Sequence, residues 1–206
     1  MIVSNNIELY LEPCEIIDFD TSQEIAELSQ EIAAKSTDEV DFVKNAFEYV
    51  RDEISHSGDI NGSIVTCRAS DVLRERQGVC YAKSHLLAAI LRCRGIPAGF
   101  CYQLLVLDDE LAPELILHGL NAAYVGGKWV RLDARGNKPG VNAQFSLNRE
   151  QLAFPVRPEK GEEDIPLNFV KPDANVVRAL TSHKNIETLW HNLPTELQKR
   201  FAATQP

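Results

Sequence analysis

Apolar residues recur at helical spacing in the first quarter of the chain, in two separate runs. Thr21 or Ser22 can cap a first helix, and Thr37 or Asp38 can cap a second. The positions expected on the buried faces are Ile25, Leu28 and Ile32 in the first run and Val40, Val43, Phe47 and Val50 in the second. Because the other faces carry Glu and Lys, the pattern predicts two amphipathic helices.

Less regular segments lie before and after these helices. Residues 7–20 alternate polar and apolar positions in part and include Pro13, which predicts an extended segment or an edge strand. Residues 55–66 are rich in Gly, Asp and Asn, so we expect a loop there. A short helix is expected to begin at residues 69–73 and to stop at Gly78.

Residues 81–94 tolerate a helix at almost every position, and their apolar side chains cover more than one face. Such a helix is typical of the centre of a domain, where it is buried on all sides. The sequence Gly95-Ile96-Pro97 then ends it.

Beyond residue 97 the period of the apolar positions changes from 3.6 to 2. Strands are predicted at residues 100–107, 118–125 and 128–133, with Gly126-Gly127 as a tight hairpin turn between the last two. Helices followed by an antiparallel sheet indicate an α+β fold, with N-terminal helices and a central helix packed on the sheet.

The remainder of the chain is expected to add little to the sheet. Residues 157–172 are rich in Pro, Glu and Gly and are expected to form a surface loop, followed by weak helical patterns at 176–182 and 195–201. With 206 residues, of which 44% are hydrophobic, the chain can bury one substantial core. We therefore expect a single domain over residues 1–206, in which 157–206 form a loop and a helical C-terminal extension.

Charge and targeting signals narrow the expected partners. The chain has 21 basic and 30 acidic residues and a net charge of −9, which is the wrong sign for binding nucleic acid or an anionic membrane surface. Its first residues lack a basic segment and a long apolar stretch, and no segment approaches the roughly 20 apolar residues that span a bilayer. We expect a cytoplasmic protein; the sequence does not predict its oligomeric state.

Cys80 has the sequence context of a reactive thiol. The five cysteines are an odd, scattered set, which favours free thiols in a reducing compartment over a disulfide framework. Cys80 falls at the first turn of the predicted buried helix, where unpaired N–H groups and the helix dipole lower a thiol pKa. Cys93 lies at the opposite end of that helix and Cys101 lies in an apolar strand, so both are expected in the core.

A thiolate nucleophile also needs a base and a group that orients the base. If Gly126-Gly127 is a two-residue turn, Leu120 lies opposite Asp133, and His118 is one diagonal step away on the same side of the sheet. The two side chains can then meet. A three-residue turn would place them on opposite faces, so this prediction depends on the turn.

Residues 78–98 read Gly-Val-Cys-Tyr-Ala-Lys-Ser-His-Leu-Leu-Ala-Ala-Ile-Leu-Arg-Cys-Arg-Gly-Ile-Pro-Ala. This run closely resembles the nucleophile helix of the transglutaminase-like superfamily, in which Gly-x-Cys leads to Leu-Arg-x-x-Gly-Ile-Pro-Ala. Residues 129–133 resemble the family's Trp-x-x-x-Asp strand, and residues 49–54 and 69–73 resemble the segments that precede its cysteine. The motif core covers about residues 42–135.

The resemblance implies a papain-like fold and a Cys-His-Asp triad made of Cys80, His118 and Asp133. It implies acyl transfer or hydrolysis at a peptide or glutamine carboxamide through a thioacyl intermediate, without a cofactor or metal. Crosslinking transglutaminases have Gly-Gln-Cys-Trp, whereas this chain has Gly-Val-Cys-Tyr and no acidic loop resembling a calcium site. A hydrolase or peptidase outcome is therefore expected over protein crosslinking.

Further residues are candidates for the cleft. The backbone N–H of Cys80 is expected to be one oxyanion donor. Gln77, Tyr102 and Trp129 are candidates for a second donor, and Arg135 and Asn137 are expected to line the cleft because they follow the aspartate strand.

Alternative interpretations explain fewer residues. His85 is expected to be a packing residue, and the other histidines, His56, His183 and His191, carry no supporting pattern. Metal binding by Cys67, Cys80, Cys93, Cys101 and His118 is disfavoured because no C-x-x-C or H-x-x-x-H pair occurs. A non-catalytic binding module with the same fold stays open, since sequence alone does not distinguish an active triad from an inherited one.

Overall fold

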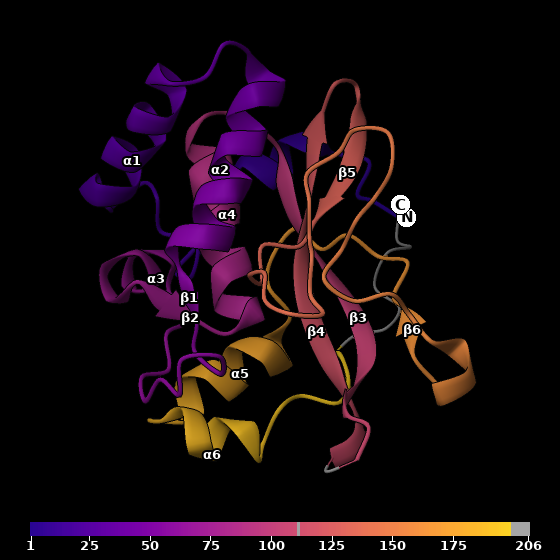
Figure 1. The fold of residues 1–206 in the computed structure, drawn as a ribbon. Helices are drawn as coiled ribbons and strands as arrows, with labels where there is room; N and C mark the ends of the chain where they lie inside the picture. Colours follow the sequence, from indigo (N-terminus) through magenta and orange to yellow (C-terminus); the bar gives the residue numbers. More distant parts are fainter. Residues whose placement is uncertain (111, 199–206) are drawn as a thin grey trace.

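The computed structural model describes residues 1–110 and 112–198. Its helices and strands run in the order η1 (Ile7–Leu11), α1 (Gln23–Ala34), α2 (Glu39–Glu53), β1 (Ser55–His56), α3 (Ala69–Glu75), β2 (Gln77–Gly78), α4 (Cys80–Cys93), β3 (Ala98–Asp108), β4 (Ala112–Val125), β5 (Lys128–Leu132), η2 (Pro158–Lys160), β6 (Glu163–Asp164), α5 (Ala174–Ser182) and α6 (Ile186–Trp190). Figure 1 shows the N-terminal helices on one side and the main sheet on the other.

The first two helices begin at the predicted caps. The Ser22 side chain accepts a hydrogen bond from the N–H of Ile25 at the start of α1, and the Asp38 side chain does the same for the N–H of Asp41 in α2. The predicted apolar positions point inward: all are buried except Val40, which is half-buried. Both amphipathic helices are therefore confirmed.

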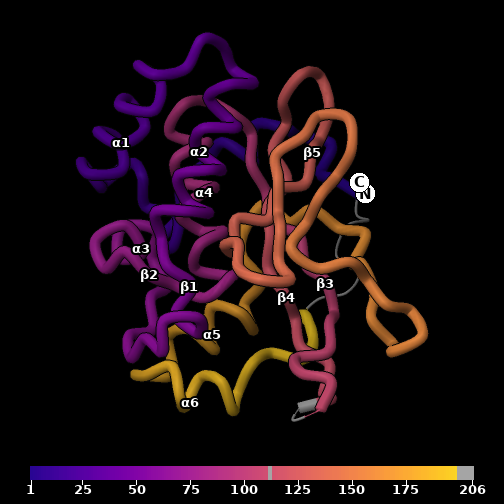
Figure 2. Tube along the Cα trace, viewed as in Figure 1, coloured from indigo at the N-terminus to yellow at the C-terminus, as the bar shows by residue number. Residues whose placement is uncertain are grey.

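Helix α4 lies between the other helices and the sheet, in contact with α1, α2, α3, β3 and β4 (Figures 1 and 2). Every side chain from Cys80 to Arg92 is buried, which explains why its apolar residues cover more than one face. The helix starts one residue before the predicted range and stops ahead of Gly95, whose φ of +81° suits glycine at a helix end.

The main sheet has the strand order β5-β4-β3-β6, and all its pairings are antiparallel. Val125 pairs with Lys128 and Tyr124 with Trp129, which is the register of a two-residue turn at Gly126-Gly127. Both glycines have positive φ, 60° and 78°, as a tight hairpin with two left-handed residues requires. The turn on which the predicted register depends is thus confirmed.

Strand β5 ends at Leu132, so the neighbouring edge of β4 is taken up by other elements. The hydroxyl of Tyr81, in the first turn of α4, donates to the carbonyl of Leu117. The N–H of Leu117 donates to the carbonyl of Pro194 at 2.8 Å. At Gly119 an added Cβ would lie 2.7 Å from Cδ1 of the Tyr81 ring, so glycine permits this close approach of helix and strand.

Residues 7–20 differ from the predicted extended strand. Residues Ile7–Leu11 form the 3₁₀ helix η1, whose first turn is capped when the Asn6 side chain accepts from the N–H of Glu8. Tyr10 is fully buried, and its hydroxyl donates to the Asn168 carbonyl at 2.8 Å. This anchoring to a distant segment outweighs the local alternation.

The C-terminal third also contains more structure than predicted. Within the predicted loop 157–172, β6 pairs with Gln103 and Leu104 at the open edge of β3. Helix α5 confirms the pattern at 176–182, whereas α6 was not predicted. Residues 195–198 of the helix predicted at 195–201 are not helical, and the remainder lie outside the described residues. Figure 2 shows α5 and α6 running below the helical layer towards β4.

The fold is α+β, with the buried helix α4 packed against an antiparallel sheet, as predicted. Hydrophobic residues of the helices, the sheet and the C-terminal segment join in one large core cluster. Among residues 1–110 and 112–198, none of the helices has the length and apolar character needed to cross a bilayer.

Candidate active site

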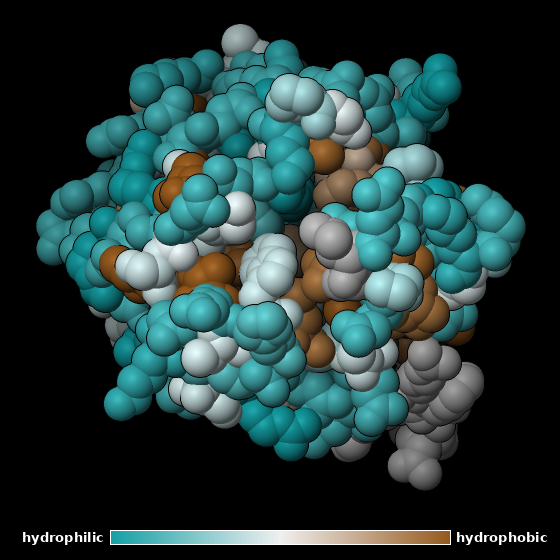
Figure 3. Space-filling view, turned by 60° about the horizontal axis from the view of Figure 1, so that its bottom comes forward, coloured by the Kyte–Doolittle hydropathy of each residue, from teal (hydrophilic) through white to brown (hydrophobic). Residues whose placement is uncertain are grey.

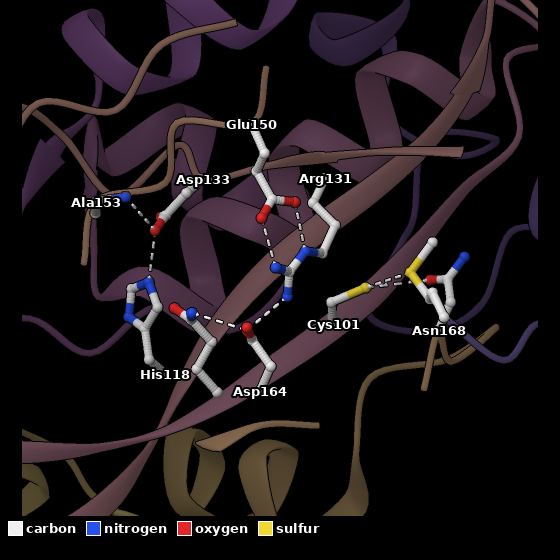
Figure 4. A network of polar contacts seen from close by, with 10 residues as sticks. Cys101, His118, Arg131, Asp133, Glu150, Ala153, Asp164 and Asn168 are labelled. Carbon is white, nitrogen blue, oxygen red and sulfur yellow. Dashed lines mark hydrogen bonds and ion pairs between the residues drawn. The ribbon is translucent and has the colours of Figure 1, made fainter. Parts of the chain in front are cut away.

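His118 and Asp133 meet where β5 ends. The register pairs Asn121 with Leu132, which places Asp133 one step diagonally from His118. The Nε2 atom of His118 lies 2.8 Å from Oδ2 of Asp133 (Figure 4). The structure therefore brings together the two side chains that the hairpin register predicted to meet.

Asp133 is buried and is held as a carboxylate. Its Oδ1 accepts the N–H of Arg135 at 3.2 Å, and its Oδ2 accepts the N–H of Ala153 at 3.0 Å. Burial alone would raise the pKa of Asp133, but the charge of His118 and the hydrogen bonds from His118, Ala153 and Arg135 outweigh burial and lower it. A charged, fully engaged carboxylate fixes both the position and the tautomer of the imidazole.

His118 is held in its protonated form. Burial alone would lower the pKa of His118, but the charges of Asp133 and Cys80 and hydrogen bonds to both side chains raise it to about 10. Because Nε2 faces Asp133, the other ring nitrogen, Nδ1, is left for Cys80. His118 is thus joined to Asp133 and shares the cavity with Cys80.

Cys80 is the first residue of α4, and Val79, which precedes it, provides no side-chain cap. The N–H groups of a first helical turn have no acceptor within the helix, so they favour negative charge at this position. The Tyr81 hydroxyl, in the first turn of α4, bonds to the carbonyl of Leu117, the residue before His118 on β4. This bond attaches the start of α4 to the strand beside His118. Tyr81 follows Cys80 and Leu117 precedes His118, so this bond holds the two candidate residues near each other.

Residues 150–153, which contain the donor to Asp133, are bound to the sheet by an ion pair. Arg131 on β5 donates from Nε and Nη2 to the two carboxylate oxygens of Glu150, both at 2.6 Å (Figure 4). Three residues later, Ala153 donates to Asp133. Phe154 packs edge-on against the His118 ring, with a centroid distance of 5.3 Å and an interplanar angle of 86°.

Cys80 and His118 open into a cavity of about 490 Å³. Part of its wall is apolar and includes Leu105, Leu107, Ile116, Phe154, Trp190 and Leu193. Another part is charged or polar and includes His56, Asp59, Arg135, Lys138, Arg157 and Glu162. Figure 3, turned to show the bottom of the molecule, has hydrophobic side chains near the centre of this face with hydrophilic ones around them. The volume suits a small ligand or a few residues of a peptide.

Of the five predicted cleft residues, Arg135 is the one that lines this cavity. Tyr102 is buried outside the lining, where its hydroxyl accepts the N–H of Asp173 at 2.9 Å. Asn137 bonds within its own loop, with both side-chain atoms on the backbone of Ala143. Neither side chain is directed at a substrate.

The other two candidates also lie elsewhere. Trp129 packs against Tyr10 and Tyr124, with centroid distances of 4.7 Å and 5.6 Å, beside the hairpin turn at the other end of β5 from Asp133. Gln77 lies on β2, and its Oε1 is 2.4 Å from the site of a Cβ at Gly62. A second side-chain oxyanion donor is therefore not found among the predicted residues.

His56 and Asp59 line the cavity although no sequence pattern singled them out. His56 ends β1 and Asp59 lies in the loop that follows, which closes onto the segment after β5. Arg135 donates to both carboxylate oxygens of Asp59, and Lys138 donates to Oδ1 at 2.7 Å. A Gly- and Asp-rich loop gives no signal for such contacts, because its partners are more than 70 residues away in the sequence.

Lys83, one turn after Cys80, is a buried cation that sequence reasoning also missed. Its Nζ donates to the carbonyls of Arg51, at 3.2 Å, and Ile54 at the C-terminal end of α2. A cation is favourable there because the carbonyls carry the negative end of the helix dipole. Burial, and secondarily the charge of Arg135, lower the pKa of Lys83 to about 7.

The cysteines of the disfavoured metal-site alternative are dispersed. Cys80 and Cys93 occupy opposite ends of α4, and Cys101 lies in a separate cluster with Leu120 and Ala122. Within the described part of the chain, no three His, Cys, Asp or Glu side chains are grouped in a way that suits a metal ion.

Comparison with protein families agrees with this geometry. A family model described as the transglutaminase-like superfamily matches residues 26–134, which is more than half of the chain. The chain belongs to the transglutaminase-like superfamily. The match contains Cys80, His118 and Asp133 but ends before Phe154, Trp190 and the other C-terminal residues of the cavity wall. No curated protein sequence matches the chain.

Solved structures of similar fold include a candidate cysteine protease from Cytophaga hutchinsonii, which is 24% identical with a TM-score of 0.52. That match covers 64% of this chain and 43% of the other. A candidate protease from Parabacteroides distasonis is 20% identical (TM-score 0.41; 61% of this chain, 26% of the other). A protein described as a TGase is 18% identical (TM-score 0.41; 70% and 40%). This transglutaminase-like chain thus matches less than half the length of each of these three proteins.

Proposed function

We propose that this protein is a cysteine-dependent enzyme that cleaves an amide bond through a thioacyl intermediate, with water as the favoured acceptor. The observation that carries the proposal is the 2.8 Å contact of His118 with Asp133 in a cavity that Cys80, at the start of α4, also lines. Membership in the transglutaminase-like superfamily supports cysteine-based catalysis in general.

In the first half-reaction the Cys80 thiolate attacks the carbonyl carbon of the amide. A carbon–sulfur bond forms, and the backbone N–H of Cys80 at the helix start donates to the developing oxyanion. The carbon–nitrogen bond then breaks, and the imidazolium of His118 gives its proton to the leaving amine. His118 is left neutral, and the acyl group is a thioester on Cys80.

In the second half-reaction the neutral His118 takes a proton from water as the water oxygen attacks the thioester carbon. The carbon–sulfur bond breaks, the carboxylic acid product leaves, and the thiolate and imidazolium are restored. Hydrolysis is favoured because water needs no binding site of its own, whereas an amine acceptor must be held against the thioester. Asp133 stays ionised and holds the imidazole throughout.

The test is alkylation of the native protein with iodoacetamide over a range of pH, with each cysteine followed by peptide mass spectrometry. Cys80 should react fastest, and His118→Ala should remove that advantage. Cys67 and Cys101 are internal controls, because burial raises the pKa of each to about 12. Equal reactivity of all the cysteines would instead favour a non-catalytic binding module.

The acceptor is tested separately with glutamine-containing peptides. Release of ammonia or of an amine without any added amine indicates hydrolysis, and incorporation of an added amine indicates transfer. Cys80→Ala should abolish either reaction. Amine incorporation without hydrolysis would contradict the favoured outcome while leaving the triad in place.

A further inference from the structure

Arg135, Lys138 and Asp59 form a charged cluster in the cavity wall that the chemistry above does not use. Arg135 makes two hydrogen bonds to the Asp59 carboxylate, one of them at 2.9 Å, and Lys138 makes one at 2.7 Å. Arg135 and Lys138 lie in the segment that follows Asp133, and the backbone N–H of Arg135 donates to Asp133.

The cluster is adjacent to the reacting groups. The guanidinium of Arg135 lies over the Phe154 ring, 5.8 Å from its centroid, and the same ring packs against His118 at 5.3 Å. Arg135, Phe154, His118 and Cys80 all line one cavity. A ligand bound at Cys80 therefore occupies the same cavity as the side chains of Arg135 and Lys138.

Charge in the cluster is not balanced. Two cations share one carboxylate, which leaves one positive charge in excess within this cluster. The acidic residues Asp109 and Glu162, elsewhere in the cavity wall, are paired with Arg157. His56, which also lines this part of the cavity, does not add a carboxylate or a stable charge. Burial and then the charge of Arg135 lower its pKa to about 3, and Arg135 also contributes to the lowered pKa of Lys83. The positive charge of Arg135 thus contributes to the lowered pKa of both His56 and Lys83.

Hydrogen-bond donors also remain. The bonds to Asp59 involve two nitrogens of Arg135 and leave other guanidinium and ammonium N–H groups that can serve an incoming acceptor. The side chain of Arg135 is only 8% exposed, so its position is fixed, whereas that of Lys138 is 43% exposed and can turn towards a ligand. A planar acceptor with two oxygens matches this donor set.

We propose that Arg135 and Lys138 form a carboxylate-binding subsite beside Cys80, and that the substrate is an amide with a carboxylate close to the scissile bond. This inference rests on the proposed function, since it gives the substrate class for the same site. The Asp59 carboxylate orients the two cations but neutralises only one of them. The competing explanation is a purely structural tie between the loop at 57–62 and the segment after β5.

The two explanations differ in how Cys80 reacts with a matched pair of reagents. Iodoacetate and iodoacetamide alkylate the same thiol by the same displacement, and only iodoacetate carries a carboxylate. The quantity to measure is the ratio of their second-order rate constants at Cys80, relative to the ratio for glutathione. We expect that ratio to exceed the glutathione value and to fall as salt is added, because salt screens the attraction.

Three variants of the full chain isolate the subsite. Lys138→Gln should lower the iodoacetate preference by about fivefold, the size expected for one partly exposed ion pair. Lys138→Arg should keep it. Lys128→Gln, at the exposed hairpin turn, removes the same charge from the surface and should leave the ratio unchanged. Thermal denaturation of each variant checks that it is folded.

The outcomes separate the two proposals. If Cys80 is selectively alkylated but Lys138→Gln changes the ratio no more than Lys128→Gln does, the cluster is a structural tie and the subsite is wrong. The salt dependence in the unaltered protein decides the same point if Lys138→Gln does not fold. If Cys80 shows no selective reactivity with either reagent, the proposed function fails, and the subsite fails with it.

Discussion

His118 and His56 line the same cavity, and both rings are buried, yet their surroundings act on them in opposite directions. His118 lies 2.8 Å from an Asp133 oxygen, and its pKa is raised to about 10. His56 lies 4.0 Å from Asp59, and burial together with the charge of Arg135 lowers its pKa to about 3. Burial favours the neutral form of both rings, so the carboxylate decides the difference. Asp133 is available to its histidine, whereas Asp59 is engaged by Arg135 and Lys138.

The two parts of the cavity also differ in how they are held. Cys80 lies at a helix start, His118 on β4 and Asp133 directly after β5, with a backbone N–H on each oxygen of Asp133. The Asp59 cluster joins two loops through side chains. Rigid elements suit chemistry that depends on short distances, and loops suit recognition that can vary. Bonds would therefore change at Cys80, whereas the substrate would be selected at the Asp59 cluster.

The largest expected effect comes from removing the charge that distinguishes the two histidines. Asp133→Asn leaves His118 buried without a carboxylate, as His56 is, so the imidazolium is no longer favoured. Amide turnover should fall on the order of 10⁴-fold, as for other triads that lose this charge. Steady-state kinetics on a peptide amide checks this. Asp164→Asn, which removes a carboxylate from the far end of the Arg131 network, is the matched control. Comparable losses in both variants would contradict the assigned role of Asp133.

The pH dependence of acylation sharpens the same comparison. His118 must be protonated to supply the proton of the leaving amine, and it is protonated below its pKa, which is raised to about 10. The acylation rate should therefore persist in alkaline solution and decline as the pH rises through about 10. In Asp133→Asn the decline should move to lower pH. A wild-type decline centred near the ordinary histidine value of about 6.5 would contradict the protonated state of His118.

A moderate effect is expected on stability when Asp59 is neutralised. Asp59→Asn leaves the buried guanidinium of Arg135 without its counter-ion, and the free energy of unfolding should fall by about 1–3 kcal/mol, since the partly exposed Lys138 contributes little. Urea denaturation measures it. The same variant frees both cations, so it should raise the iodoacetate preference of Cys80. A decrease in that preference would show that Asp59 is needed to place the cations.

The smallest effect is expected at His56. Because its ring is neutral over most of the pH range, His56→Phe keeps the edge-on contact with Trp190 and should change stability by less than about 1 kcal/mol, equally at pH 5 and pH 8. Histidine NMR signals give a direct check. His56 should not titrate between pH 5 and 8, and a midpoint within that range would remove the contrast with His118.

The sequence was sufficient for the main helices and strands and for the contact between His118 and Asp133. The nucleophile helix was marked by a local motif, and the meeting of His118 with Asp133 followed from the two glycines of one hairpin, whose predicted register the structure confirms. Both inferences rest on short-range geometry. The capping residues of α1 and α2 were predicted for the same reason.

The surroundings of the triad depended on long-range contacts and could not be predicted. His56 and Asp59 reach the cavity because their loop closes onto the segment after β5, and no local pattern encodes that contact. Trp129 was chosen for its type, but it lies by the hairpin turn, whereas Asp133 follows the opposite end of β5. The alternation pattern gives the face of a strand on which a side chain lies, but not how far along the strand the cleft is, so Trp129 was placed wrongly.

The carbonyl of Pro194, which accepts the N–H of Leu117 next to the candidate base, lies outside the segment shared with the superfamily. Trp190 and Leu193, from the same stretch, form part of the chamber wall. Residues beyond the shared segment therefore complete a cavity whose other walls, and Cys80, His118 and Asp133 themselves, lie within that segment. Substitutions at Trp190 or Leu193 can therefore change the shape of the cavity without changing Cys80, His118 or Asp133. Relatives that carry the same three residues need not prefer the same substrate.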